Sequence, residues 1–197
     1  STQFVLCEIL VLGDNSIFKA CFVYAENKHA VRKEFFGNMV KISQSQSNVP
    51  LVFLGDFNAI RYQYEKFGGT SVWSPEKEEF NSCIIHSGLD ELSYSGCQFT
   101  WANKRDSGQY IATKIDRVLV NEVWLDLYPN SCATFLTSSI SDHSPAVVTV
   151  SEAITSFKKP FKFFDFWSNH EDFLPAVSKV WNQYILGVPM FRVCQKL

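Results

Sequence analysis

Short apolar runs and stretches of helical spacing follow each other along the chain, which predicts strands interleaved with a few helices. Two runs, "FVLCEILVL" (4–12) and "FKACFVYA" (18–25), flank the turn-forming Gly13-Asp14-Asn15-Ser16 and predict a β-hairpin. Residues 29–43 carry apolar side chains at the spacing of an amphipathic helix. The run "LVFLGDFN" (51–58) is apolar at successive positions, so it predicts a strand buried on both faces.

A second helix is predicted over residues 74–88. Ser74 is a candidate N-cap, Pro75 occupies the first helical position, and Gly88 ends the pattern.

Further strands are predicted downstream of this helix. "CQFTWAN" (97–103) and "KIDRVLV" (114–120) predict two strands, and "EVWLDLYP" (122–129) predicts a short amphipathic turn. "CATFLTSSI" (132–140) leads into "SDHSPAVVTV" (141–150), whose apolar tail predicts a buried strand. Strands with a few helices in this number suggest an α+β sandwich of two sheets.

Composition limits the class of protein. The 197 residues, 46% of them hydrophobic, suffice for one core with an appendage, and the net charge of −2 provides no overall basic field for nucleic acid. The six cysteines include no CxxC pair, so zinc-site spacing is absent, and we interpret them as reduced, mostly buried thiols of an intracellular protein. No apolar run reaches membrane-spanning length.

A change in composition predicts a domain boundary near residue 155, with one domain at 1–155 and a segment at 156–197. The segment opens with Lys158, Lys159 and Lys162 among phenylalanines. These residues either grip a nucleic-acid backbone or pack against a downstream domain, and a helix with an exposed apolar face is expected to follow.

Several predicted strands end in polar groups that a core does not need. Singly, each has an ordinary explanation: Tyr24 as a core aromatic, Asp56 and Asn58 as turn residues, and Asp116 as the partner of Arg117 in a surface or strand-end ion pair. Asp142 and His143 could belong to a capped loop in the same way.

Together these groups suggest a single site, because sandwich folds bring the ends of distant strands to one edge. To gather three carboxylates with an amide, a phenol and an imidazole there would be electrostatically costly without a cation or a phosphate chemistry to justify it. Oxygen ligands with one imidazole and no thiolate suit Mg²⁺ or Mn²⁺.

The motifs "VYAEN", "LVFLGDFNAI", "EKFGG", "FTWAN", "KIDRVLVNEVW" and "SDHSPAVV" occur in an order that resembles the endonuclease/exonuclease/phosphatase superfamily. The chain is most similar to the endonuclease domain of plant LINE-type (non-LTR) retrotransposon polyproteins, and its tail resembles the connector to the reverse transcriptase. The resemblance implies a DNase I-like, four-layer α/β/β/α sandwich of two mixed sheets that lacks its first strands, followed by a C-terminal helical connector.

The resemblance also implies catalytic roles. Asp56 would orient or deprotonate the attacking water, with Asn58 holding that water and the phosphate. His143 would stabilise charge on the scissile phosphate, and Asp116 would keep the imidazole of His143 oriented and cationic.

Binding roles follow from the same resemblance. Asp142 would belong to the shell of a Mg²⁺ or Mn²⁺ ion, Tyr24 would donate to a phosphate oxygen, and Thr100 would contact the nucleic-acid strand. The family's first two motifs, an Asn and a metal-binding Glu, have no counterpart before Tyr24, because Glu8 lies mid-strand. Weak binding of Mg²⁺ is therefore expected.

The function implied is that of a metal-dependent endonuclease that nicks DNA, with weak or no activity in this truncated form. Its partners would be DNA and the downstream reverse transcriptase domain, its location nuclear when it acts on chromosomal DNA, and no membrane would be involved. Two alternatives stay open: a phosphatase or phosphodiesterase of the same fold, and a catalytically silent remnant that retains DNA or protein binding.

Overall fold

The computed structural model describes residues 2–13, 15–69, 75–105 and 108–150, and in the C-terminal part residues 167–168, 170–186, 188–189, 192 and 196. The chain divides into two compact units, Ser1–Pro160 and Phe161–Leu197. The first unit holds every candidate site residue.

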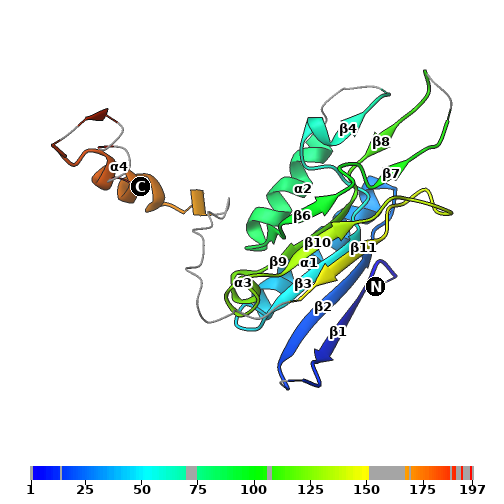
Figure 1. Ribbon diagram of the computed structural model, residues 1–197, viewed down its shortest axis with the longest axis horizontal. Helices are drawn as coiled ribbons and strands as arrows, with labels where there is room; N and C mark the ends of the chain where they lie inside the picture. The colour runs from blue at the N-terminus through cyan, green and yellow to red at the C-terminus, as the bar shows by residue number, and fades with distance from the viewer. Residues whose placement is uncertain are drawn as a thin grey trace. The chain divides into compact units, whose positions relative to one another are not determined.

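The largest sheet has five strands in the order β1-β2-β3-β9-β5 (Figure 1). Their bounds are β1 Phe4–Leu10, β2 Ile17–Tyr24, β3 Leu51–Asp56, β9 Asp116–Val120 and β5 Asp90–Glu91. The strands β2 and β3 run parallel, and the other pairs are antiparallel. The predicted hairpin and the buried central strand β3 are both confirmed.

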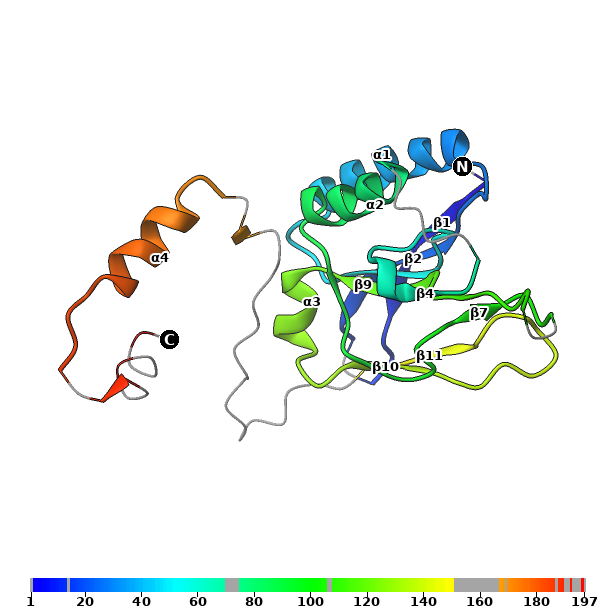
Figure 2. The ribbon, with the colours of Figure 1, turned by 90° about the horizontal axis from the view of Figure 1, so that it is seen from above.

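Two helices, α1 (His29–Ser45) and α2 (Pro75–His86), lie side by side over one face of this sheet (Figure 2). A parallel pair needs a crossover connection, and α1 provides it between β2 and β3. Aromatic rings fill the space between helices and sheet. The ring centroid of Phe80 lies 5.2 Å from that of Phe36, which stacks on it, and 5.6 Å from that of Phe57. The apolar stripe that predicted α1 and the apolar residues of α2 therefore form this core.

The opposite face of the large sheet packs against a second sheet, ordered β11-β10-β6. Its strands are β6 (Tyr94–Gly96), β10 (Cys132–Phe135) and β11 (Ala146–Thr149). The short helix α3 (Glu122–Leu127) connects β9 to β10 and buries Trp124 between the sheets. Helices, sheet and sheet make three layers among the described residues of this unit, and the predicted sandwich of two packed sheets is confirmed.

A third, small sheet extends from one end of the sandwich, in the order β4-β8-β7. It consists of β4 (Lys66–Phe67), β8 (Ala112–Thr113) and β7 (Trp101–Ala102), and the 3₁₀-helix η1 (Gln63–Glu65) leads into β4. An isolated bridge joins Trp101 to His143, which ties this sheet to the loop before β11.

Two sequence predictions need correction here. The tail of "SDHSPAVVTV" is not a buried strand, because β11 is an edge strand on which Ala146, Val147 and Thr149 are exposed. Of "CQFTWAN", only Trp101 and Ala102 belong to a strand. Both β11 and β7 are edge strands of the described sheets, where one side of the strand has no neighbouring strand to pair with.

The described cysteines of the first unit are free thiols. Cys21 and Cys83 are buried, and burial raises the pKa of each thiol to about 12. Cys7, Cys97 and Cys132 are only half-buried, so the expectation of mostly buried thiols holds for two of these five. Cys194 lies outside the described residues.

The C-terminal unit contains the helix α4 (Phe173–Trp181). Its apolar side chains are exposed, including Leu174 and Trp181. The basic and aromatic positions 157–164, and Ser74 as the predicted N-cap, lie outside the described residues. No helix in the described part of the chain combines the length and the hydropathy that crossing a membrane requires.

Candidate active site

Three of the predicted site residues form a row across the ends of neighbouring strands. Tyr24 of β2 pairs in register with Asp56 of β3, and Asp56 pairs with Asp116, the first residue of β9. Side chains alternate along a strand, and Val118, two residues beyond Asp116, packs between the two sheets. The row Tyr24–Asp56–Asp116 therefore points toward the second sheet, not toward the helices.

Gly55 makes the approach of β2 and β3 possible at this point. Its φ is +132°, and a Cβ atom there would lie 2.1 Å from the carbonyl oxygen of Val23 on the adjacent strand. Any side chain would separate the strands just where Tyr24 and Asp56 must meet. The glycine of the "GDFN" motif is thus a packing requirement of the strand end.

The turn after β3 is built by Asp56 and Asn58. The backbone N–H of Asn58 donates to Asp56 Oδ1 at 2.7 Å, and its side-chain amide donates to Asp56 Oδ2 at 3.1 Å and to the carbonyl of Ala25 at 2.8 Å. Asn58 has a φ of 48°, a left-handed conformation that Asn tolerates. The motif is a turn, as its residue types indicate, and the same turn fixes the carboxylate in place.

His143 reaches this row from the loop that precedes β11. Its Nδ1 atom lies 3.0 Å from Asp116 Oδ2 and 3.2 Å from Oδ1. The neighbouring Asp142 accepts a hydrogen bond at 2.8 Å from the indole N–H of Trp101. Both residues of the "SDH" motif are therefore held, one by a strand of the large sheet and the other by β7.

Thr100 connects the strand that begins at Asp116 to the loop that carries His143. Its hydroxyl oxygen accepts from the backbone N–H groups of Ile115 at 3.1 Å and of Asp116 at 2.9 Å, and its carbonyl accepts from Ser144 at 2.7 Å. Thr100 is only 1% exposed, and its contact with a nucleic-acid strand stays a prediction. In the structure the residue ties the backbone of Asp116 to the segment that carries His143.

One cleft of about 720 Å³ unites the predicted residues. The lining includes five of them: Tyr24, Asp56, Asn58, Asp142 and His143. Asp116 contributes through its contact with His143, and Thr100 lies beneath.

Two cations that the sequence analysis missed also line the cleft, Arg32 of α1 and Lys66 of β4. Arg32 is buried and donates to the carbonyls of Glu26 and Asn27, both at 3.0 Å. Its position in the first turn of α1 gave no signal, because a single Arg at the start of a helix is common on ordinary surfaces. Both cations suit a phosphate, which needs local positive charge.

The two cleft carboxylates differ in their electrostatics. Burial raises the pKa of Asp56 to about 6, with Asp116 adding to the rise, while the N–H of Asn58 and the charges of His143 and Arg32 oppose it. The hydrogen bond from Trp101 lowers the pKa of Asp142, which is exposed. The carboxyl of Asp142 therefore stays ionised to lower pH than that of Asp56.

The donor set of the cleft fits a weakly held Mg²⁺. No group of three His, Cys, Asp or Glu side chains among the described residues could enclose a metal ion. Mg²⁺ nonetheless binds at phosphate sites through one or two carboxylates, with water and phosphate oxygens completing its shell. Asp142, ionised and exposed beside the imidazole of His143, is the carboxylate that suits this role.

Comparisons with known proteins identify the fold. Scans of protein-family models and of curated proteins find no match. Among solved structures, the endonuclease domain of TRAS1, a telomere-specific non-LTR retrotransposon, aligns with a TM-score of 0.58 and 18% identity over 76% of this chain and 64% of that one. The Neisseria 3′ phosphatase NExo, bound to a product DNA hairpin, aligns with a TM-score of 0.55 and 17% identity over 74% and 64% of the two chains.

A third structure, a Staphylococcus aureus beta toxin mutant with bound magnesium ions, aligns with a TM-score of 0.53 and 13% identity over 76% and 58% of the chains. The chain thus spans about six-tenths of the length of these solved chains. The described part of the chain shares the DNase I-like fold of these solved structures.

Proposed function

We propose that the protein is a metal-dependent phosphodiesterase-type endonuclease domain that nicks DNA. One observation carries the proposal: a buried carboxylate with a raised pKa, Asp56, and an imidazole held by a carboxylate, His143, line the same cleft. A phosphodiester needs a base for the attacking water and positive charge for its oxygens, and these two groups supply them.

In the reaction, the oxygen of a water molecule forms a bond to phosphorus while the opposite P–O bond breaks. The proton of the water passes to the carboxylate of Asp56, which is mostly ionised above its pKa of about 6. The oxygen that leaves takes a proton from solvent. Asn58 holds the base in place, because both of its N–H groups bind the carboxylate of Asp56.

His143 faces the charge that develops on the phosphate. The Nδ1–H group of His143 donates to Asp116. The other ring nitrogen, Nε2, is therefore available to meet a phosphate oxygen. Tyr24 is 72% exposed at the cleft, where its hydroxyl can donate to another phosphate oxygen. A Mg²⁺ ion held by Asp142 would neutralise phosphate charge during the reaction.

DNA is the substrate that the surroundings of the cleft favour. Arg32 and Lys66 add positive charge to the lining of the cleft. We infer a retrotransposon origin from the motif order and the likeness to the TRAS1 endonuclease domain. Residues 156–197 would then connect this domain to a reverse transcriptase, and the target would be chromosomal DNA in the nucleus.

A second candidate is a silent module of the same fold that binds DNA without cutting it. The absence of any glutamate among the described residues that line the cleft favours it, because a carboxylate pair alone holds Mg²⁺ weakly. Glu8 does not substitute, since it is exposed on β1 and pairs with Lys19 at 2.6 Å.

Nicking of supercoiled plasmid in Mg²⁺ separates these functions. We expect slow conversion to the open-circular form, abolished by EDTA and by Asp56→Asn or His143→Gln. Lys19→Met, which alters an exposed ion pair on the same large sheet, serves as the matched control and should nick normally. DNA binding without nicking by the parent chain would establish the silent module instead. Release of phosphate from a 3′-phosphorylated oligonucleotide without nicking would indicate a phosphatase.

A further inference from the structure

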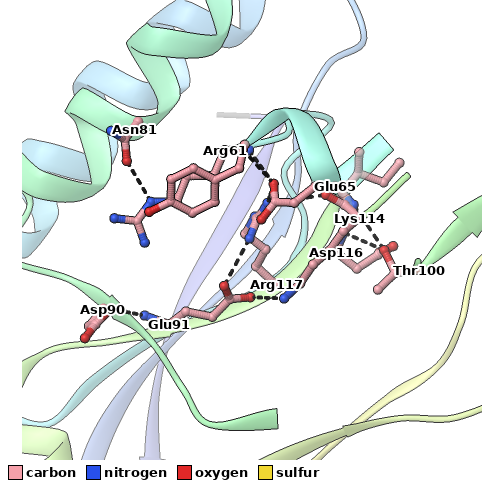
Figure 3. A network of polar contacts seen from close by, with 11 residues as sticks. Arg61, Glu65, Asn81, Asp90, Glu91, Thr100, Lys114, Asp116 and Arg117 are labelled. Atoms are coloured by element: carbon pink, nitrogen blue, oxygen red, sulfur yellow. Dashed lines mark hydrogen bonds and ion pairs between the residues drawn. The ribbon is translucent and has the colours of Figure 1, made fainter. Parts of the chain in front are cut away.

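Two buried cations flank Asp116 on β9, and both contact one carboxylate (Figure 3). The ammonium of Lys114 lies 2.6 Å from Glu91 Oε1, and the guanidinium of Arg117 lies 3.1 Å from Glu91 Oε2. The side chains of Lys114 and Arg117 are 2% and 0% exposed. The ordinary alternative for Asp116, a surface or strand-end ion pair with Arg117, does not hold, because Arg117 is buried and binds Glu91 and Glu65.

The two cations pack against different aromatic rings. Arg117 packs over the ring of Phe80 at 5.6 Å, in the core beneath the helices. Lys114 packs over the ring of Tyr94 at 3.3 Å, on the side of the second sheet. Glu91 belongs to β5, the edge strand beside β9, so its carboxylate links both cations to this edge of the sheet.

Glu65 adds a second anchor. Its carboxylate pairs with Arg117 and accepts the backbone N–H groups of Arg61 at 2.6 Å and Tyr62 at 3.1 Å. Its backbone carbonyl accepts the N–H of Lys114 at 2.9 Å. The segment before β4 is thereby attached to residues on each side of Asp116.

Stability alone does not explain this cluster. Removing four charged groups from water costs free energy, and well-packed apolar side chains of similar volume often serve a core equally well or better. What an ion-pair cluster provides is a fixed geometry, because guanidinium and carboxylate bind in defined orientations. The ion pairs here fix the geometry of Asp116. This residue lies between the two cations in sequence, and its carboxylate binds the imidazole of His143.

We propose that Lys114 and Arg117, held by Glu91 and Glu65, are positioning residues that place Asp116 against His143. The inference rests on the proposed function for its importance, since an active site tolerates errors of only about 0.5 Å in such groups. Neither cation lines the cleft or meets substrate among the described residues, so both act through Asp116.

The test uses the hydrogen bond between His143 and Asp116 as its readout. The chain has only four histidines, so the ring nitrogens of His143 can be assigned in ¹⁵N-edited spectra by comparison with His143→Gln. Lys114→Met should move the Nδ1 signal of His143 toward the position it takes in Asp116→Asn. Lys19→Met removes an ion pair of the same 2.6 Å length from an exposed site and should leave that signal in place.

Activity supplies an independent readout through a double-mutant cycle. Lys114→Met should lower kcat/KM for nicking about tenfold when Asp116 is present and less than about twofold in Asp116→Asn. A merely structural role would produce equal losses in both backgrounds. If the parent chain does not nick at all, the proposed function fails, and the His143 spectrum still decides the positioning role.

A folded Lys114→Met variant with an unchanged His143 signal would overturn the proposal. If that variant does not fold, Arg117→Lys takes its place, because it keeps the charge but loses the fork that reaches both Glu65 and Glu91. An unchanged signal in Arg117→Lys would overturn the proposal too. Failure of both variants to fold, with Lys19→Met folded, would make the cluster a folding requirement and also contradict a positioning role.

Discussion

The Nδ1 atom of His143 lies 3.0 Å from Asp116 Oδ2, although 27 positions separate the two residues in sequence. One comes from the first residue of a strand in the large sheet, the other from a loop that leads into the second sheet. The contact therefore exists only when both sheets are packed together. Folding of the sandwich and assembly of the site are the same event at this point.

Thr100 makes that assembly sensitive to a single hydroxyl group. Thr100→Val keeps the shape of the side chain but leaves the buried N–H groups of Ile115 and Asp116 without their acceptor. We expect a loss of about 2 to 4 kcal/mol in the free energy of unfolding, measured by urea denaturation. Thr100→Ser keeps the oxygen and should lose less than about 1 kcal/mol. Equal losses in the two variants would show that the methyl group, not the acceptor, matters.

Gly55 should not tolerate replacement by alanine. Gly55→Ala places a Cβ atom 2.1 Å from the carbonyl oxygen of Val23 at a φ that alanine rarely adopts, so a destabilisation of about 3 kcal/mol or more is expected. Gly37→Ala is the matched control, because nothing lies within 4 Å of its added methyl group in α1. That change should stabilise by about 1 kcal/mol. Thermal unfolding of both variants checks the contrast, and a tolerated Gly55→Ala would refute it.

The raised pKa of Asp56 predicts how stability depends on pH without metal. The folded protein holds this proton up to about pH 6, whereas an unfolded Asp releases it near its ordinary pKa of 3.8. The folded state therefore binds more protons between these values, and the free energy of unfolding falls as pH rises through this window.

Asp56→Asn removes that dependence. Between pH 3.8 and about 6, the parent should lose about 1 to 2 kcal/mol relative to Asp56→Asn, a figure reduced for solvent screening. Chemical denaturation in EDTA at several pH values measures the difference. Parallel pH profiles for the two proteins would mean that Asp56 is not perturbed by burial.

Lys66 predicts a salt-dependent contribution to DNA binding. Its place in the lining of the cleft puts its ammonium near the path of a phosphate backbone. Lys66→Ala should weaken binding of a duplex oligonucleotide several-fold and reduce the slope of log K against log salt by about 1. Lys19→Ala, near the opposite end of β2 from Tyr24, should change neither quantity. Fluorescence anisotropy at increasing salt concentrations provides both values.

The strand ends of the site could be predicted from the sequence because buried strands leave a strong signal. "LVFLGDFN" and "KIDRVLV" are apolar runs with an abrupt polar end, and the motif order supplied the pairing with "SDH". The register of β2, β3 and β9 sets Tyr24, Asp56 and Asp116 in one row. A helix connects β2 to β3, and a long segment with several short elements connects β3 to β9. Local sequence patterns contain no such pairing information.

The ion-pair cluster could not be predicted for a related reason. Glu65 and Arg117 lie 52 positions apart, and each reads as an ordinary surface charge in its own segment. Their burial follows from the short elements η1, β5 and β8, which are two or three residues long and have no periodicity to detect. The backbone role of Thr100 gave no local signal either, because a hydroxyl that accepts from the N–H groups of Ile115 and Asp116 looks the same in sequence as one that faces solvent.

We propose above all that Asp56, Asn58 and His143 act on one phosphate group. The most direct measurement is a titration of the ¹⁵N-labelled protein with a short duplex that carries phosphorothioate linkages, which resist cleavage. We predict that the amide signals of Asn58 and His143 shift together, with one dissociation constant, and that the amide signal of Lys19 does not shift. Shifts at only one of the two residues, or different dissociation constants for them, would contradict a shared phosphate site.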